Sequence, residues 1–516
     1  MWVALEGCLH GQLDCVYDSV RAAEANAGIK VSLLICCGDF QATRDNGIDL
    51  KSLACPPKFR QLNDFHKYYT GEAVAPVLTI FIGGNHEASN YMQQLPCGGW
   101  VAPNIYYMGY CGVVNVGGIR IGGLSGIFNS KHYRSPHYET CPYTPSTLRS
   151  VYHIREIDVF RLSLLSVPSG DLQADSGTKG TKSRRLDTFM SHDWPQGIAL
   201  YGDVQQLVRK KSFLKSEIGD GSLGSPPAAY LLHLLQPEHW FSAHLHVKYA
   251  AVVRHGNSKA EETAAAVAKD AAPYCPGKSV VEEEKKVASK SNITRFLSLD
   301  KAIPGRKFLQ LVHFGDEEEE TKMNKLTEET EGMEESASTV ATPVLRYDEE
   351  WLAILIATHH LWNATGKFNE TTAAQMSTKI QEERRKLRNQ PTEFFVPPKF
   401  QPSEKVGNVQ MDEFLERLGL AHIITVSSTG DGGGGGGGSD IGLRTATTVV
   451  QNNDVPSPAI IPPAMTPPSM MPPTMLPPAM MPPAMMPPAM MPPAMMPPAM
   501  MPTNTILDDP DEIDLL

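Results

Sequence analysis

Apolar runs of strand length alternate with amphipathic segments over the first half of this chain. Three such runs are 31–37, 77–83 and 120–124. Short continuous apolar runs are typical of buried strands, and 113–124 fits two short strands around a Gly-Gly turn. Apolar residues recur at helical spacing in 14–27 and 53–69, which predicts two helices. The alternation of these elements predicts an α/β domain over 1–255.

The polarity pattern changes in the second half. A stretch rich in Ala, Lys and Glu at 256–291 reads as a flexible insert, as does the polar stretch 169–185 inside the first domain. A second, smaller globular domain is expected at 292–402, although the acidic stretch 316–339 interrupts it. Its predicted helix at 348–362 is apolar on most faces, so we expect that helix to be buried.

After residue 402 the sequence shows no pattern that would form a core. Seven glycines occupy 432–438, and a Pro-Pro dipeptide recurs every five residues between Pro462 and Pro498. Glycine runs are flexible linkers, and dense proline favours extended polyproline II. We therefore expect 403–516 to be a disordered tail. The alternative is a docking ligand for the aromatic groove of a partner protein.

The charge of the chain is unevenly distributed. Of the 516 residues, 46 are Lys or Arg and 57 are Asp or Glu, which gives a net charge of −11. Residues 1–255 carry 23 of the cations and 21 of the acids, or +2, and the remaining 23 and 36 give −13. The acidity of the second half therefore does not argue against a polyanionic substrate bound by the first.

Neither a secretory signal nor a membrane span is expected. The first residues lack a basic region and a long apolar core, and no apolar stretch approaches ~20 residues. Nine cysteines, an odd number without paired zinc-ribbon spacing, indicate reduced intracellular thiols.

Six short segments combine glycine with metal-binding side chains, and several follow or end a predicted strand. They are Gly-Cys-Leu-His-Gly (7–11), Cys-Gly-Asp-Phe-Gln (37–41), Gly-Gly-Asn-His-Glu (83–87), Gly-Leu-Ser-Gly (123–126), Ser-His-Asp-Trp (191–194) and Ser-Ala-His-Leu-His (242–246). The carboxyl ends of strands are where α/β sheets place ligand-binding groups. One thiol, four imidazoles, an amide and a carboxylate are a donor set that two adjacent divalent ions could share.

The order and spacing of these segments resemble the binuclear metallophosphoesterase superfamily. Most of its members have Asp-x-His in the first segment, whereas this chain has Cys8-x-His10. That difference narrows the resemblance to the RNA lariat debranching enzymes. Further similarity lies at 36–41, 81–91, 98–105, 149–154, 295–301 and 347–352. The resemblance implies a metallophosphoesterase-type β-sandwich flanked by helices, followed by the smaller C-terminal domain.

The resemblance also implies roles for the residues of the metal centre. One ion would be held by Cys8, His10, Asp39 and His246, and the other by Asp39, Asn85, His192 and His244. A thiolate is softer than a carboxylate, so zinc, iron or manganese is expected, as one ion or two. His86 is expected to be the general acid, with a phosphate-orienting donor as the alternative. Glu87 is expected to position its neighbours.

Aromatic and cationic residues are interleaved between Ser125 and Arg155, where the family has a lariat recognition loop. Aromatic rings can stack on bases, and cations can pair with phosphates. The alternatives are a surface loop without a nucleic-acid role and ordinary packing. The candidate substrate-binding residues are Phe128, Lys131, Tyr133, Arg134, Tyr138, Arg149, Tyr152 and Arg155.

The function implied is hydrolysis of the 2′–5′ phosphodiester at the branch of excised intron lariats, which linearises them for turnover during mRNA processing. The partner would be branched lariat RNA, and the location nuclear. Two alternatives stay open. One is a phosphoesterase acting on phosphoproteins or nucleotides, and the other is a non-catalytic splicing scaffold.

Overall fold

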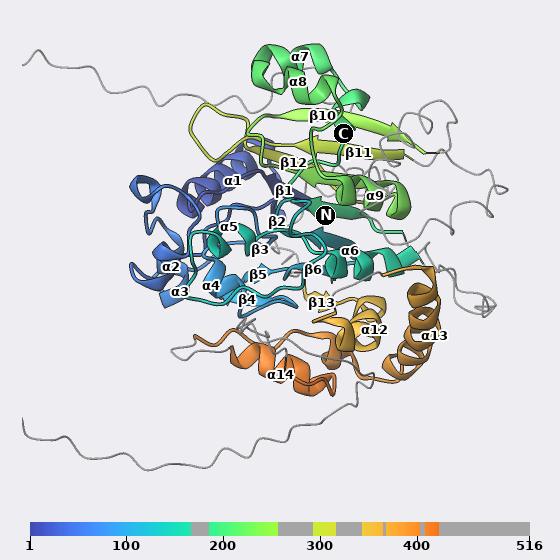
Figure 1. Cartoon of the computed structure of the whole chain (residues 1–516). Coiled ribbons are helices and arrows are strands. Elements are labelled where there is room, and N and C mark those ends of the chain that lie inside the picture. Colours follow the sequence, from blue (N-terminus) through green and yellow to red (C-terminus); the bar gives the residue numbers. More distant parts are fainter. Residues whose placement is uncertain (167–184, 256–292, 316–342, 365–367, 403–407, 423–516) are drawn as a thin grey trace, which may run out of the picture. The chain divides into compact units, whose positions relative to one another are not determined.

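Two β-sheets face each other and are flanked by helices (Figure 1). The computed structural model describes residues 1–166, 185–255, 293–315, 343–364, 368–402 and 408–422. Their buried apolar side chains form one continuous core drawn from both sheets. The expected α/β sandwich is therefore confirmed. No helix within these ranges is long and apolar enough to cross a membrane.

The first sheet has six strands in the order β12-β1-β2-β3-β5-β4. They are β1 (Trp2–Glu6), β2 (Val31–Cys36), β3 (Leu78–Phe81), β4 (Gly99–Ala102), β5 (Ile105–Tyr107) and β12 (Leu309–His313). Strands β1, β2, β3 and β5 run parallel, so their carboxyl ends lie at the same edge. Edge strands β12 and β4 are antiparallel to their neighbours.

The second sheet has seven strands in the order β10-β11-β9-β8-β7-β6-β13. They are β6 (Cys111–Val116), β7 (Ile119–Leu124), β8 (Thr188–Ser191), β9 (His239–Ser242), β10 (Tyr249–Arg254), β11 (Ile293–Ser298) and β13 (Leu345–Tyr347). Strands β7, β8, β9 and β11 are parallel. The predicted Gly-Gly turn joins β6 to β7, and both of its glycines have positive φ.

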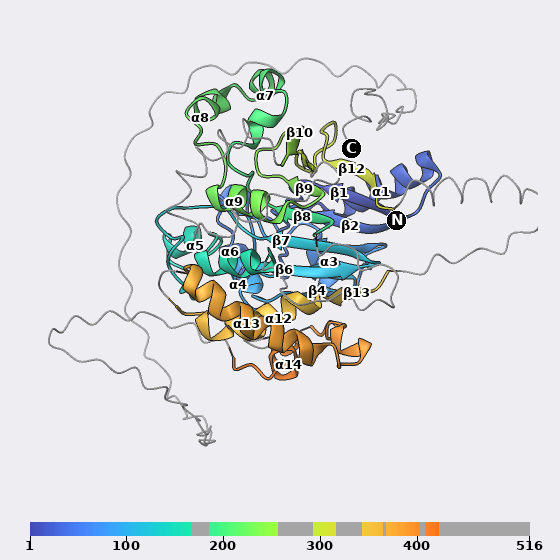
Figure 2. The same cartoon turned by 90° about the vertical axis from the view of Figure 1, so that its right-hand side faces the viewer.

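Helices lie on the outside of the two sheets (Figure 2). They are α1 (Leu13–Ala27), α2 (Ile48–Lys51), α3 (Phe65–Thr70), α4 (Ser89–Met92), α5 (Thr147–Ser150), α6 (Glu156–Ser163), α7 (Val204–Lys210), α8 (Lys215–Gly219), α9 (Pro226–Leu235), α12 (Glu349–Thr358), α13 (Glu370–Leu387) and α14 (Val409–Arg417). Both α6 and α12 contact β6, and α1 contacts β12. The expectation that the helix beginning near residue 348 is buried is confirmed, because eight of its ten residues are buried.

Of the two helices predicted for the first domain, the structure contains the one at 14–27 but not the one at 53–69. In α1, Leu13, Val16, Val20 and other apolar residues at helical spacing are buried, and the helix ends at Gly28 with φ 64°. The predicted helix at 53–69 is wrong over most of its length. A short 3₁₀ turn at Pro57–Phe59 and α3 replace it. The reason is the Pro56-Pro57 pair, since proline lacks the amide that a helix interior requires.

The second domain is not structurally separate from the first. Strand β11 lies between β10 and β9, and β12 pairs with β1, so residues beyond 292 complete both sheets. The side chain of Arg120 on β7 donates to Asp348 and Glu350, each at 2.8 Å. These links place 1–255 and 292–402 in one folded unit. The inserts at 169–185, apart from Arg185, and 256–291 lie outside the described residues.

Folded structure also continues past residue 402, where the sequence predicted disorder. Helix α14 begins at Val409 and buries Met411, Phe414 and Leu415. The side-chain amide of Gln410 donates to Trp100 O at 2.9 Å and accepts from Trp100 N at 3.0 Å. Gln410 thus provides hydrogen-bond partners for the backbone N–H and C=O of Trp100 on the edge strand β4. The prediction of a disordered tail is wrong for 408–422, and the glycine and proline repeats lie outside the described residues.

Ending the chain after residue 402 is therefore expected to destabilise it. Three apolar side chains of α14 are buried, and each contributes up to ~1.5–3 kcal/mol. We expect the free energy of unfolding in urea to fall by about 3 kcal/mol or more. A chain ending after residue 423 keeps α14 and is the control. Equal unfolding midpoints for the two chains would show that α14 does not support the core.

Candidate metal centre and substrate surface

Each of the seven predicted ligands follows the carboxyl end of a parallel strand. Cys8 and His10 follow β1, Asp39 follows β2, and Asn85 follows β3. From the second sheet, His192 follows β8, and His244 and His246 follow β9. The turns after these strands are tight. The backbones of His10, Asp39, His244 and His246 have φ between 48° and 63°, a region that costs energy for residues other than glycine.

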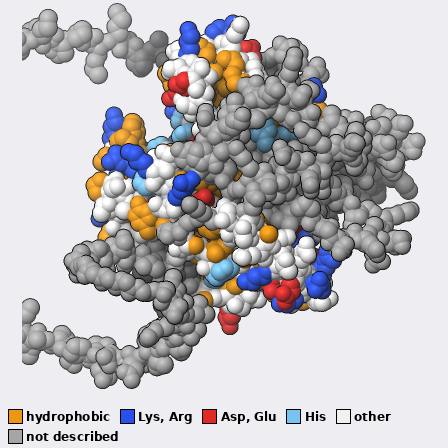
Figure 3. Space-filling view, turned by 45° about the vertical axis from the view of Figure 1, so that its right-hand side comes forward, with side chains coloured by type: hydrophobic (Ala, Val, Ile, Leu, Met, Phe, Trp, Pro, Cys, Tyr) orange, Lys and Arg blue, Asp and Glu red, His pale blue; other side chains and the backbone are white. Residues whose placement is uncertain are grey.

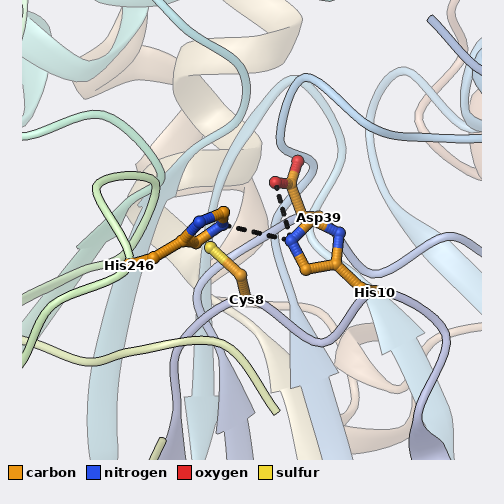
Figure 4. A group of neighbouring side chains, drawn as sticks. All are labelled: Cys8, His10, Asp39 and His246. Atoms are coloured by element: carbon orange, nitrogen blue, oxygen red, sulfur yellow. Dashed lines mark hydrogen bonds and ion pairs between the residues drawn. The ribbon is translucent and has the colours of Figure 1, made fainter. Parts of the chain in front are cut away.

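The first group of donors contains Cys8, His10, Asp39 and His246. One donor atom from each lies within 4.8 Å of the others. The Nε2 atoms of His10 and His246 face each other at 3.2 Å, and His10 Nε2 lies 3.7 Å from Asp39 Oδ2 (Figure 4). The Cys8 sulfur is fully buried and accepts from His244 N at 3.1 Å. Two imidazole nitrogens, a carboxylate oxygen and a sulfur converging in this way fit a single divalent ion.

The second group consists of Asp39, Asn85, His192 and His244. His192 Nε2 lies 3.4 Å from Asp39 Oδ1 and 3.2 Å from Asn85 Oδ1. The other ring nitrogen of His192 donates to Cys37 O at 2.8 Å, which directs Nε2 toward the group. The rings of His192 and His244 are 5.0 Å apart. Asp39 alone belongs to both groups, so its carboxylate is placed to bridge two ions.

The electrostatics of most of the donors favour cations. His192 is the exception, since burial alone would lower its pKa but Asp39 raises it. Burial, together with His10, lowers the pKa of His246 to about 3, and burial also lowers the pKa of His10 and His244. Although burial alone would raise the pKa of Asp39, the adjacent His192 and His10 hold it well below its usual range. Neutral imidazoles and an ionised carboxylate are the forms that coordinate metals.

Cys8 behaves differently from the other donors. Burial, reinforced by the nearby Asp39 and Glu6, raises the pKa of the Cys8 thiol well above its ordinary value. A thiolate at this position therefore requires a compensating cation, and a bound metal ion would supply one.

Glu87 and two side chains around His10 support the metal centre. The Glu87 carboxylate accepts from Phe40 N, Gly84 N and Gln41 N at 2.8–2.9 Å, so it joins the loops after β2 and β3. Burial and the nearby Asp39 raise its pKa to about 7. A side chain at Gly84 would overlap the Asp39 carboxylate.

Sequence reasoning missed the two residues that hold His10. Gln41 Nε2 lies 3.2 Å from His10 Nδ1, and Asn63 Nδ2 donates to His10 O at 3.2 Å. Gln41 ends the 37–41 motif, a signal that could have found it. Asn63 stands in no motif.

His86 lies beside the metal groups without belonging to either of them. Its backbone amide donates to Asp39 Oδ1 at 2.8 Å, and its ring is 5.6 Å from that of His10. Its buried Nδ1 has no hydrogen-bond partner among the described residues. The imidazole is therefore close enough to the centre to act on a group bound there.

The segment 125–155 contacts the loop that carries Asn85 and His86. Gly126 N donates to Gly83 O at 2.8 Å, and Gly83 N donates to Ser125 Oγ at 2.9 Å. Tyr152 lines a small cavity together with Gly83 and Gly84. The segment therefore adjoins the second donor group.

Six of the eight candidate substrate-binding side chains in 125–155 reach the surface. Lys131, Arg134 and Arg149 are exposed, and Phe128, Tyr138 and Tyr152 are partly buried. Tyr133 and Arg155 are fully buried, because the Tyr133 ring packs against Phe128 and Arg155 pairs with Glu139 at 2.5 Å. The expectation that these two residues contact RNA directly does not fit the structure. They support the segment from inside.

Comparison with known proteins agrees with this geometry. The family model of calcineurin-like phosphoesterases matches residues 1–248, and the sandwich with its paired donor groups is of that class. Such enzymes use divalent metal ions, and the donors described above fit them. The family model of the lariat debranching enzyme C-terminal domain matches residues 291–423. The chain belongs to the lariat debranching enzyme family.

Several relatives cover large parts of the chain. A lariat debranching enzyme of Arabidopsis thaliana is 41% identical over 440 residues, which are 83% of this chain and 88% of that protein. Those of Danio rerio and Homo sapiens are 47% and 45% identical over 71% of this chain. The matched region is 53% of the fish protein and 55% of the human one, so this chain spans about half of their length.

Replacing Cys8 with aspartate tests the thiol ligand. A carboxylate is harder than a thiolate, so the bound metal should shift toward manganese. Metal content after purification from a mixed-metal medium measures the shift, and Cys15→Ser, a partly exposed thiol on α1, is the control. An unchanged metal profile in Cys8→Asp would place Cys8 outside the coordination sphere.

Proposed function

We propose that this protein hydrolyses the 2′–5′ phosphodiester at the branch point of RNA, as found in excised intron lariats. The observation that carries the proposal is the convergence of all seven ligands, with Cys8 in the first position, in a chain of the lariat debranching family. The candidate metal centre lies beside the segment 125–155, which presents cations and aromatic rings. This neighbourhood suits a substrate with unpaired bases and phosphates.

The residues of the site have distinct tasks in this reaction. The two donor groups, which share Asp39, would hold divalent ions that could supply a hydroxide nucleophile at neutral pH and charge stabilisation for the phosphate. Asp39 holds the two donor groups together, and Glu87 fixes the loops that carry them. His86 would donate a proton to the departing 2′ oxygen, since an alkoxide is a poor leaving group without one. Lys131, Arg134 and Arg149 would pair with the phosphates of the branch.

The metal is proposed to be zinc, iron or manganese, because a buried thiolate and four imidazoles favour these ions over magnesium. Lariats arise where introns are excised, so a nuclear location and a role in mRNA processing are proposed with the substrate. Splicing-associated proteins are proposed as partners of the tail.

The experiment that tests the proposal compares two substrates. Purified protein loaded with metal is incubated with a synthetic branched RNA and, separately, with a simple aryl phosphomonoester. We expect linear RNA with a free 2′ hydroxyl from the first substrate and little turnover of the second. Rapid turnover of the monoester with no cleavage at the branch would favour the phosphoesterase alternative.

Substrate choice is expected to depend on the exposed cations of 125–155. A charge-assisted hydrogen bond contributes ~1.5–3 kcal/mol, so Arg134→Ala should lower kcat/KM for branched RNA by about tenfold or more. Turnover of a small aryl phosphodiester should change much less. Arg21→Ala on the exposed face of α1 is the control. Equal losses on both substrates would mean that Arg134 only maintains the fold.

A further inference from the structure

A second basic surface lies outside the segment 125–155. The sequence Arg-Lys-Lys-Ser-Phe-Leu-Lys at 209–215 contains four cations and no acid. It runs from the end of α7 through a 3₁₀ turn into α8. The Phe213 side chain is 67% exposed, and it is one of the most exposed large apolar residues among those described. Figure 3 shows hydrophobic and cationic side chains together with some acidic ones at the top of this face, where Figure 1 draws α7 and α8.

Buried side chains and hydrogen bonds anchor the segment 209–215 to the core, so its polar side faces outward. Leu207 and Leu214 are buried, and the carboxylate of Asp203 caps α7 through Gln206 N at 2.8 Å. The hydroxyl of Tyr249 on β10 donates to Ala199 O at 2.6 Å, which holds the preceding turn to the second sheet. An exposed aromatic ring on an anchored segment is available for a ligand.

This surface extends to the first donor group of the metal centre. Cys8 N donates to Asp300 O at 3.3 Å, and Ala302 N donates to Cys8 O at 3.1 Å. Lys301, the residue between these two, forms an isolated parallel β-bridge with Cys8, so its backbone lies beside the first donor group. Burial lowers the pKa of Lys211, Asp300 opposes this effect, and Arg306 and Lys301 reinforce it, so Lys211 lies near 300–306. Cations at Lys211, Lys301 and Arg306, with the carboxylate of Asp300 among them, therefore lie between Cys8 and the end of α7.

The cations of 209–215 are not held in ion pairs. Within the part of the chain that the structure describes, no carboxylate lies within 4.0 Å of the charged groups of Arg209, Lys211 or Lys215. Asp203, Glu217 and Asp220 flank the segment on α7 and α8, and Arg306 pairs with Asp300 at 3.2 Å. The four cations of 209–215 thus form a basic patch whose charged groups remain open to a ligand. Such a patch attracts a polyanion.

We propose that this surface, formed by Arg209, Lys210, Lys211, Phe213, Lys215 and Lys301, binds one single-stranded arm of the branched RNA. The inference rests on the proposed function. A branch point has three arms, and 125–155 is hydrogen-bonded to the loop that carries Asn85 of the second donor group. The surface reaches the first donor group through Lys301, which is bridged to Cys8, so it can receive a different arm. Its cations would pair with phosphates, and Phe213 would stack on a base. RNA fits better than an acidic protein because the patch leads directly to the metal ligands.

The test measures binding of the full chain to a branched RNA whose 2′–5′ linkage cannot be cleaved. The variants are the triple Arg209→Gln, Lys211→Gln, Lys215→Gln and the single Phe213→Ala. The control triple is Arg385→Gln, Arg388→Gln and Lys386→Gln on α13, which removes the same charge from a surface far from α7 (Figures 1 and 2). All of these side chains are exposed except that of Lys211, which is partly buried.

We expect the 209–215 triple to weaken binding about tenfold or more. The plot of log K against log salt should become less steep by about 2, since each lost phosphate contact changes the slope by ~0.7 for single strands. Phe213→Ala should weaken binding about tenfold with little change in slope, as expected for the loss of one stacked base. The loss of affinity caused by the 209–215 triple should disappear when one particular arm of the RNA is shortened. The loss should persist when either of the other two arms is shortened.

Unchanged affinity in both variants, or an equal loss in the control triple, would overturn the inference. Variants that bind RNA normally but have lost binding to poly-glutamate would also overturn the inference, because that result would point to an acidic protein partner.

A different result would contradict the proposed function. Parent protein that binds branched RNA but never cleaves a natural branch would contradict the function, whereas normal cleavage with unchanged binding in the variants would contradict only this surface.

Discussion

Replacing Asp39 with alanine will abolish turnover and lower the metal content of the purified protein. Asp39 is the only carboxylate shared by the two donor groups, with Oδ2 near His10 and Oδ1 near His192. Its Oδ1 also accepts from His86 N. Loss of an outer-shell partner typically costs 10–100-fold, and loss of a bridging ligand should cost far more. Metal analysis and cleavage of branched RNA measure the two effects.

The control for this variant is Asp45→Ala. Asp45 is an exposed carboxylate six residues further along the chain, and it accepts only from Gly47 N in its own turn. It should keep its metal and its activity. If Asp39→Ala retained most of its turnover, the two groups could not share a ligand, and the centre would have to be described as a single site.

Replacing His86 with alanine is expected to leave the metal content near normal and slow the chemical step by ~10²–10⁴-fold, the usual range for general acid catalysis. The structure places this ring next to the donor groups but outside both of them. Single-turnover cleavage of branched RNA gives the rate of the chemical step, and metal analysis shows whether the centre is intact.

Leaving-group chemistry separates the two roles open to His86. An aryl phosphodiester releases a stable phenolate and needs little help from an acid. If His86 donates the proton, the alanine variant should lose much less activity on the aryl substrate than on RNA. Similar losses on both would assign His86 to orienting the phosphate. Loss of metal alone would make His86 a ligand.

The convergence of the candidate donors could be predicted from the sequence because the signals are local. Each candidate ligand lies in the loop after an apolar run that forms a strand, as Asp39 follows β2 and Asn85 follows β3. The parallel order of the strands then brings their ends together. The helix at 14–27 was predicted for a similar reason, since a periodic apolar face needs no information about distant residues.

The parts that could not be predicted depend on distant partners. Tyr133 and Arg155 look like surface side chains in the sequence, and contacts made only in the folded chain, such as those with Phe128, Glu139 and Ser150, make them internal. Helix α14 is short, and its stability comes from the edge of β4, about 310 residues earlier. The basic segment 209–215 was missed because it has a single aromatic residue, and because Lys301 is brought beside Cys8 only in the folded chain, by backbone pairing of Cys8 with Asp300 and Ala302.

The insertion of β11 between β9 and β10 sets the order in which this protein can be assembled. Within the described residues β11 is the only strand that pairs with β10, so during synthesis β10 has no partner strand until residues 293–298 have left the ribosome. The backbone of Cys8 likewise lacks these hydrogen-bond partners until residues 300–302 have been synthesised, because it pairs with Asp300 and Ala302. A nascent chain of 255 residues would already contain every predicted metal ligand but would leave the sheet incomplete beside them.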